Sequence, residues 1–236
     1  MKIGGLQKTS LIDFPDCVSA VVFLQGCNFR CPFCHNPELV LARFFQKPFE
    51  ESEFFAFLGK RKGQLDGIVI SGGEPTVHAD LPDFIRKIRT LGFKIKLDTN
   101  GSNPKMLGDL YAEKLLDYVA MDLKGEPERY EDYCGAQVSG PAIRESIGLI
   151  MDSGIPYEFR TTAVTGQHDL AKLKALAEMV RGADRYAIQA FRPDLCLDPG
   201  YEKLARYDMT EVRNERAWFD SVVKTFEIRG DVSKVG

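Results

Sequence analysis

Six short runs rich in strand-forming residues divide the chain into repeating units. They cover residues 18–25, 67–71, 94–98, 118–123, 157–163 and 186–191. Several runs are apolar at nearly every position, as expected for parallel strands that are covered on both faces. Between the runs, apolar residues recur three or four positions apart, which is the spacing of an amphipathic helix; Leu81, Phe84, Ile85 and Ile88 form one such set. The pattern predicts six strand–helix units with parallel strands.

Six units are too few for the usual closed barrel of eight strands. We therefore predict an α/β fold in the form of a partial (β/α)6 TIM-like barrel, with a doubly wound sheet as the alternative. No repeat, low-complexity tract or linker divides the chain, so we expect a single domain over residues 1–236. The tail, residues 210–236, predicts one more helix at 212–223 and a final strand at 225–229.

Polar motifs follow four of the predicted strands. They are Gly26-Cys27, Gly72-Gly73-Glu74-Pro75, Asp98-Thr99-Asn100-Gly101 and Asp122-Leu123-Lys124. In parallel α/β folds the carboxyl ends of the strands form the ligand-binding face. The four motifs are therefore expected to meet in one site.

Composition narrows the class of ligand. The net charge is −3 with both signs spread along the chain, which argues against a nucleic-acid backbone or an anionic membrane as partner. The apolar runs are too short to span a bilayer, and the N-terminus has no apolar signal segment, so we expect a cytoplasmic protein. In that reducing compartment, closely spaced cysteines indicate metal binding or catalysis rather than disulfides.

Three of the six cysteines, Cys27, Cys31 and Cys34, form a Cys-x3-Cys-x2-Cys loop after the first predicted strand. Three thiolates in one loop suit a cubane iron–sulfur cluster, and they leave one of its four irons open to a ligand. The alternative is structural zinc with His35 as fourth ligand. Zinc sites usually pair Cys-x2-Cys with a distant second pair, which this chain lacks.

The segment from Gly26 to Asn36 resembles the signature of the radical S-adenosylmethionine (SAM) superfamily, including the aromatic Phe33 before the third cysteine. The resemblance implies that Cys27, Cys31 and Cys34 hold a [4Fe–4S] cluster whose open iron binds SAM. Reductive cleavage of SAM then gives methionine and a 5′-deoxyadenosyl radical. By position, Phe33 would lie near the adenine.

The same resemblance assigns further SAM contacts. Gly72-Gly73-Glu74 matches the element that contacts the amino group, and Asp98-Thr99-Asn100 matches the element at the ribose and carboxylate. The residues alone leave other interpretations open. The first run is also typical of a tight strand-to-helix turn, and the second of a polar turn before a helix.

The fourth and fifth predicted strands carry charged residues that the resemblance also assigns to SAM binding. Asp122 and Lys124 resemble the Asp-x-Lys element of activating enzymes, in which the lysine binds the SAM carboxylate, and Arg160 would reach toward SAM. The related pyruvate formate-lyase activating enzymes suggest a monovalent cation at Asp98, Thr99 and Asp122. They also carry a histidine near the end of the sixth strand, where Gln189 or Arg192 would replace it in this chain. Salt bridges within the pairs Asp122–Lys124 and Glu158–Arg160 are the competing interpretations.

Residues 4–16 narrow the resemblance to the activating proteins of anaerobic (class III) ribonucleoside-triphosphate reductase. It implies an oxidoreductase with one cluster, which abstracts hydrogen from a backbone glycine of a partner enzyme, with Asp13 near that glycine. The expected partners are a class III reductase and an electron donor such as flavodoxin or ferredoxin.

Three alternatives remain. One is an activase of pyruvate formate-lyase type, and another is a small-molecule enzyme similar to 7-carboxy-7-deazaguanine synthase, which usually carries a modified cluster loop. The third is an electron-transfer protein with Cys134 or Cys196 as fourth ligand. Otherwise these two thiols and Cys17 are expected to be packing residues. His78 and His168 are expected at the surface.

Overall fold

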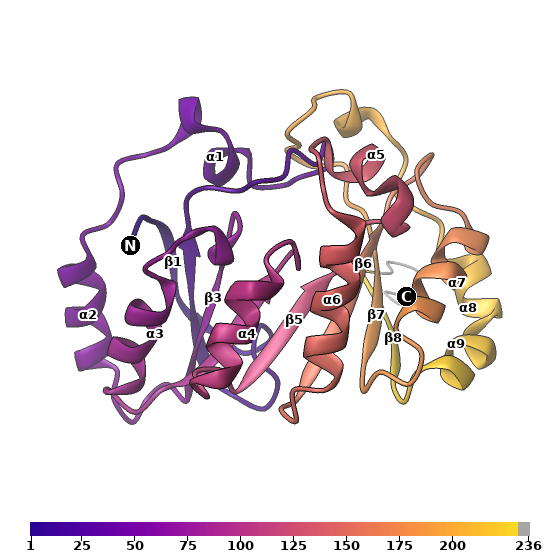
Figure 1. Cartoon of the computed structure of the whole chain (residues 1–236). Coiled ribbons are helices and arrows are strands. Elements are labelled where there is room, and N and C mark those ends of the chain that lie inside the picture. The colour runs from indigo at the N-terminus through magenta and orange to yellow at the C-terminus, as the bar shows by residue number, and fades with distance from the viewer. Residues whose placement is uncertain (231–236) are drawn as a thin grey trace.

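All eight strands that the structure describes belong to one sheet, in the order β1 to β8 (Figure 1). The structure is a computed structural model, and it describes residues 1–230. The strands are β1 Ile3–Ser10, β2 Ser19–Leu24, β3 Gly67–Gly72, β4 Lys94–Thr99, β5 Tyr118–Asp122, β6 Tyr157–Ala163, β7 Tyr186–Ala190 and β8 Phe226–Arg229.

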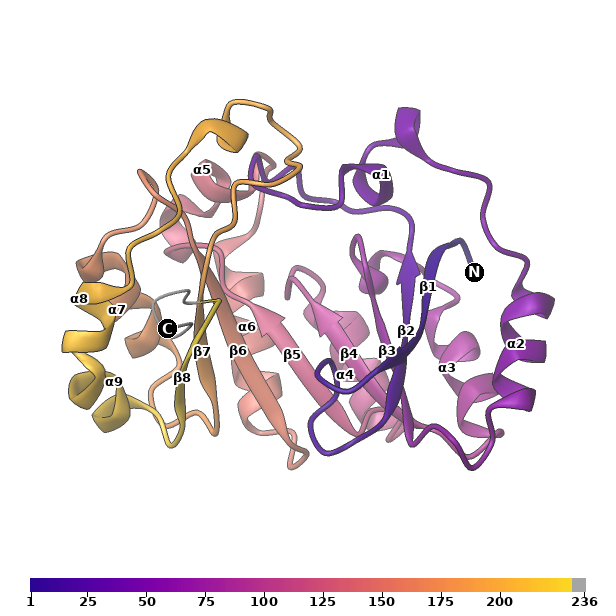
Figure 2. The same ribbon diagram turned by 180° about the vertical axis from the view of Figure 1, so that it is seen from behind.

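The sheet forms an open, partial barrel. Strands β2 to β8 pair in parallel, and β1 and β8 lie at opposite ends of the sheet and do not pair. Figure 2 shows the concave face, with the helices lying behind it on the outer side. The prediction of a parallel, partial (β/α)6 barrel is confirmed, and the six predicted strands match β2 to β7 within about one residue at each end.

Strand β1 is the one described strand that the sequence pattern does not predict. Its sequence, IGGLQKTS, has two glycines and four polar residues, and it pairs antiparallel with β2 from Ile3–Leu24 to Ser10–Ser19. Because β1 runs against β2, the loop of residues 11–18 lies at the opposite end of β2 from the cysteine loop. Tertiary pairing, rather than intrinsic strand preference, stabilises this strand.

Nine α-helices lie among the described residues. They are α1 Pro37–Val40, α2 Glu51–Lys60, α3 Leu81–Arg89, α4 Pro104–Ala112, α5 Tyr130–Cys134, α6 Gly140–Met151, α7 Leu170–Met179, α8 Thr210–Asn214 and α9 Arg216–Val222. The helix predicted at 212–223 is divided at Glu215 into α8 and α9, and the final strand is β8. The end of the predicted tail, residues 231–236, lies outside the described residues. No helix in the described chain is long and apolar enough to cross a membrane.

The two faces of the sheet differ in chemistry. The outer face packs against the helices in one large apolar core. The inner face has only a small apolar cluster, in which Phe14 and Cys17 of the loop after β1 contact Val21, Val69 and Tyr118. Cys17 is thus a packing residue, as predicted. The rest of the inner face is largely polar, and its polar residues extend to the carboxyl ends of the strands.

Candidate active site

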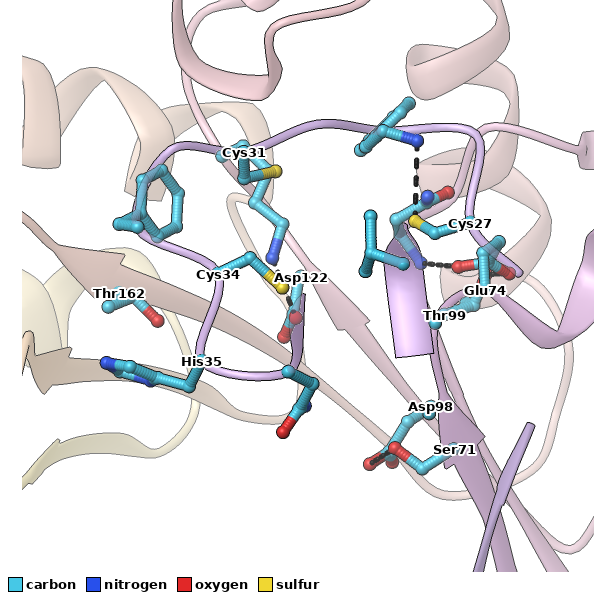
Figure 3. A pocket seen from close by; sticks show the side chains of 18 of the residues that line it. Cys27, Cys31, Cys34, His35, Ser71, Glu74, Asp98, Thr99, Asp122 and Thr162 are labelled. Carbon is cyan, nitrogen blue, oxygen red and sulfur yellow. Dashed lines mark hydrogen bonds and ion pairs between the residues drawn. The ribbon is translucent and has the colours of Figure 1, made fainter. Parts of the chain in front are cut away.

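One pocket of about 260 Å³ collects the motifs at the carboxyl ends of the parallel strands (Figure 3). Every predicted site residue except Asp13 lines it. These residues are Cys27, Cys31, Phe33, Cys34, Gly72, Gly73, Glu74, Asp98, Thr99, Asn100, Asp122, Lys124, Arg160 and Gln189. The expectation that parallel strands would bring the motifs together is therefore met.

The cysteine loop crosses this edge of the sheet and is held on both sides. Gly26 adopts a positive φ of 104°, a conformation that favours glycine, and turns the chain out of β2. On one side the Arg30 amide donates to the Cys134 carbonyl of α5 (2.7 Å). On the other side the Leu197 amide donates to the Cys34 carbonyl (2.9 Å). Contacts from distant segments thus fix the loop over the pocket.

The three cysteine side chains of the loop line the pocket at separate points (Figure 3). Burial raises the pKa of all three thiols, that of Cys27 to about 11 and that of Cys31 to about 12. Thiolates are the form that binds metal, so a group that binds here must displace these protons. No three His, Cys, Asp or Glu side chains in residues 1–230 meet where they could hold a single metal ion.

His35 does not complete a zinc site with these cysteines. Its ring stacks on Phe191, with centroids 5.4 Å apart, and its Nε2 lies 2.7 Å from the Arg192 carbonyl oxygen. Cys134 and Cys196 are buried, and neither lines the pocket with the three cysteines of the loop. Both thiols lie in the apolar core, as expected of packing residues.

Glu74 links two strand ends. Its carboxylate accepts hydrogen bonds from the Thr76 amide (3.0 Å), the Thr99 hydroxyl (2.8 Å) and the Asn100 amide (2.6 Å). Burial raises the pKa of this carboxyl, although these hydrogen bonds oppose the shift. The side chain therefore holds the end of β4 beside the turn after β3. Its contact with a SAM amino group stays a prediction.

Replacing Gly73 by alanine is expected to displace the cysteine loop, because the added Cβ would overlap the Gly26 carbonyl oxygen. Overpacking of this kind costs about 1–3 kcal/mol. Urea unfolding and iron content after anaerobic reconstitution would measure both effects. Gly108→Ala in α4 is the control, because nothing lies within 4 Å of its new methyl group, and it should be neutral or slightly stabilising. A Gly73→Ala protein with wild-type stability and iron content would contradict this packing argument.

Two aspartate and three cationic side chains form a network of ion pairs along the inner side of the pocket. Arg160 Nε and Lys124 Nζ each lie 2.9 Å from an Asp122 oxygen. Asp98 lies 2.5 Å from Lys96 Nζ and 3.6 Å from Arg160 Nη1. The Asp122–Lys124 salt bridge, which was the competing interpretation, therefore exists, and Arg160 lies closer to Asp122 than to Glu158 (3.9 Å).

These ion pairs keep the side chains of Asp98, Asp122 and Lys124 charged. Burial raises the pKa of Asp98 and Asp122, but the charge of Arg160, with Lys96 or Lys124, outweighs it and leaves each pKa below its usual value. Burial lowers the pKa of Lys124, and the Asp122 charge more than reverses that shift. The pocket thus presents fixed charges that could orient the amino and carboxylate groups of a bound amino acid.

His168 is buried, and its prediction as a surface residue is wrong. Its side chain is 6 % exposed; Nδ1 accepts a hydrogen bond from the Val164 amide (3.1 Å), and Nε2 lies 3.1 Å from the Lys124 carbonyl oxygen. Burial lowers its pKa, so the ring is neutral at pH 7. The ring supports the backbone of Lys124, a role that no sequence spacing signals. His78 is half-buried and lies beside Gly26 rather than fully at the surface.

Gln189 and Asp13 occupy different regions. Gln189 lines the pocket and donates to the Thr162 hydroxyl (3.2 Å). Asp13 lies in the loop after β1, where it accepts a hydrogen bond from Ser10, and it does not line the pocket. Its role near a target glycine stays a prediction.

Comparison with known proteins agrees with this geometry. The model of the Radical SAM superfamily matches residues 21–180, which include the cysteine loop and the strand-end motifs. The chain belongs to the radical SAM superfamily.

Two proteins similar to this radical SAM protein are named as activating enzymes. A Methanocaldococcus jannaschii protein, named provisionally as a glycyl-radical enzyme activating enzyme, is 35 % identical over 96 % of this chain and 98 % of its own. The pyruvate formate-lyase-activating enzyme of Streptococcus mutans is 29 % identical over 79 % of this chain and 75 % of its own.

A solved structure supports the fold. SuiB of Streptococcus suis superposes with a TM-score of 0.66 at 17 % identity, over 90 % of this chain. The chain matches about half of that longer protein (49 %), so the likeness concerns the shared barrel alone.

Membership of the radical SAM superfamily makes the chain an enzyme and implies a [4Fe–4S] cluster and SAM, and the pocket fits both. Cys27, Cys31 and Cys34 provide three separated sulfurs of one loop, which suits a cluster that presents several irons better than a single ion. Lys124 Nζ lies 5.9 Å from the Phe33 ring centroid, which places a cation beside the cysteines. Fixed charges and a buried aromatic ring together suit a zwitterionic, adenine-bearing ligand.

Proposed function

We propose that the protein is a glycyl-radical-enzyme activating enzyme, with class III ribonucleoside-triphosphate reductase as its partner. The similarity to a relative of that name over nearly the full length of both chains carries the proposal. The sequence of residues 4–16 supports the choice of reductase over pyruvate formate-lyase. We further propose a cytoplasmic location, with flavodoxin or ferredoxin as electron donor. The cofactors of this proposal are one cluster and SAM.

In this function the residues of the pocket bind the cluster and SAM, orient them and enclose the reacting groups. The cluster and SAM supply, when bound, a 5′-deoxyadenosyl radical that takes the α-hydrogen of a glycine and leaves as 5′-deoxyadenosine. Cys27, Cys31 and Cys34 would hold the cluster, and Lys124 would bind the SAM carboxylate. Asp98 would contact the amino acid or ribose portion. Fixing the reactive group in this way favours one C–H bond over others.

The test is anaerobic. The reconstituted protein with dithionite and SAM is expected to form 5′-deoxyadenosine, whereas Cys34→Ala is not. With a class III reductase added, electron paramagnetic resonance should show a glycyl radical; pyruvate formate-lyase in its place should remain unmodified. A radical on pyruvate formate-lyase alone would replace the proposed partner. Abundant 5′-deoxyadenosine with no glycyl radical on either enzyme would overturn activation as the function.

A further inference from the structure

Alternating charges continue down the inner face of the sheet below the pocket. Lys96 and Asp98 project from β4, Asp122 from β5, and Arg160 from β6. Further along, Glu158 of β6 pairs with Arg229 of β8 at 2.6 Å. Each member contacts an opposite charge on its own or another strand. Lys96 and Arg229 are the members that neither the motifs nor the family resemblance predicted.

The Lys96 side chain is fully enclosed. It is 2 % exposed, and its Nζ contacts Asp98 Oδ1 at 2.5 Å and lies 5.8 Å from the Tyr118 ring centroid. Among the described residues, no other carboxylate lies within ion-pair distance of this ammonium group. A buried ammonium is costly unless it is paired, so Lys96 and Asp98 depend on each other.

The carboxylate oxygens beside the pocket are already in contact with cations. Asp98 has Lys96 at Oδ1 and Arg160 at Oδ2, and Asp122 has Arg160 at Oδ1 and Lys124 at Oδ2. Lys96, Lys124 and Arg160 thus face Asp98 and Asp122, and Arg160 also lies 3.9 Å from Glu158. A metal cation would have to displace these side-chain cations from the carboxylate oxygens that it needs as ligands.

We propose that Lys96 is a built-in counter-ion that holds Asp98 in place at the SAM site and takes the role that a bound monovalent cation would otherwise fill. SAM binding by this chain therefore requires neither Na⁺ nor K⁺. Lys96 is a positioning residue, because it acts through Asp98 and does not line the pocket. The inference rests on SAM binding in this pocket and not on which partner the enzyme activates.

The first measurement is the dissociation constant of SAM for the reconstituted wild-type protein, by anaerobic calorimetry. Buffers contain choline, Na⁺ or K⁺ as the sole monovalent cation. The constant is expected to agree within about twofold among the three, which is less than 0.5 kcal/mol in binding free energy. Binding that strengthens tenfold or more with Na⁺ or K⁺ over choline would overturn the proposal.

The second measurement uses Lys96→Ala, with Lys94→Ala as matched control, because Lys94 is on the same strand but exposed. In choline buffer, Lys96→Ala should bind SAM at least about tenfold more weakly, a loss of about 1.4 kcal/mol. Methylammonium or K⁺ should restore much of the affinity by filling the vacated cation position. Lys94→Ala should bind normally in every buffer.

Unchanged affinity of Lys96→Ala in choline, or a loss that no added cation restores, would overturn the counter-ion role. Lys96→Met retains the aliphatic stem and serves as the second variant if the alanine protein folds poorly. Circular dichroism and iron content report on folding in each case. A wild-type protein that binds SAM without Na⁺ or K⁺ but activates no glycyl radical enzyme would refute the proposed function and leave this inference intact.

Discussion

Cys31→Ala is expected to prevent formation of the [4Fe–4S] cluster and to lower 5′-deoxyadenosine production by at least about 100-fold. The estimate is a lower bound, because loss of a residue that merely supports a metal ligand already costs about 10–100-fold. The three loop cysteines line one pocket, and no described cysteine elsewhere lines it and could replace Cys31. Iron and sulfide content, the visible absorption of the cluster and 5′-deoxyadenosine after reduction would measure the effect.

Cys134→Ala is the matched control for that experiment. Cys134 is a buried thiol, and its Sγ lies 3.4 Å from the Ala136 carbonyl oxygen. It does not line the pocket, so its loss should leave iron content and SAM cleavage unchanged apart from a modest loss of stability. Loss of the cluster in Cys134→Ala with an intact fold would instead support a fourth cysteine ligand and the electron-transfer alternative.

Arg160→Met is expected to lower the free energy of unfolding by about 3 kcal/mol, near the lower limit for a broken buried ion pair, because the Arg160 and Asp122 side chains are 20 % and 34 % exposed. Arg160 is the shared partner of Asp98 and Asp122, and its removal leaves both with less compensating charge. SAM binding should weaken as well. Urea unfolding and calorimetry would measure the two effects. Arg86→Met is the control: Arg86 contacts Glu113 at the surface, where such pairs contribute at most about 1 kcal/mol.

The same variant should change the dependence of stability on pH. The pKa values of Asp98 and Asp122 lie below their ordinary value of 3.8, so ionisation of these groups stabilises the folded state above that pH. This contribution is lost as the pH falls through the lower pKa values of the folded protein. Wild-type stability should therefore fall more steeply below about pH 4 than that of Arg160→Met. Parallel acid profiles for the two proteins would show that Arg160 does not hold these pKa values down.

The sequence by itself determined the parallel strands and which motifs line the pocket. Runs such as residues 67–71 and 118–123 are apolar enough to specify buried strands from local pattern alone. Because parallel strands share an edge, motifs directly after them had to meet there. The spacing of Cys27, Cys31 and Cys34 indicated the chemistry, since metal ligation from one loop depends on local geometry.

Tertiary structure decided the features that depend on distant neighbours. Strand β1 forms because β2 offers it a partner, and its glycines and polar residues carry no apolar pattern. His168 is buried because the Lys124 carbonyl and Val164 amide satisfy its ring nitrogens. Lys96, which would ordinarily be exposed in sequence-based reasoning, is enclosed because Asp98 balances its charge on the inner face. In each case the cost of burial or pairing is offset by a group that only the fold brings near.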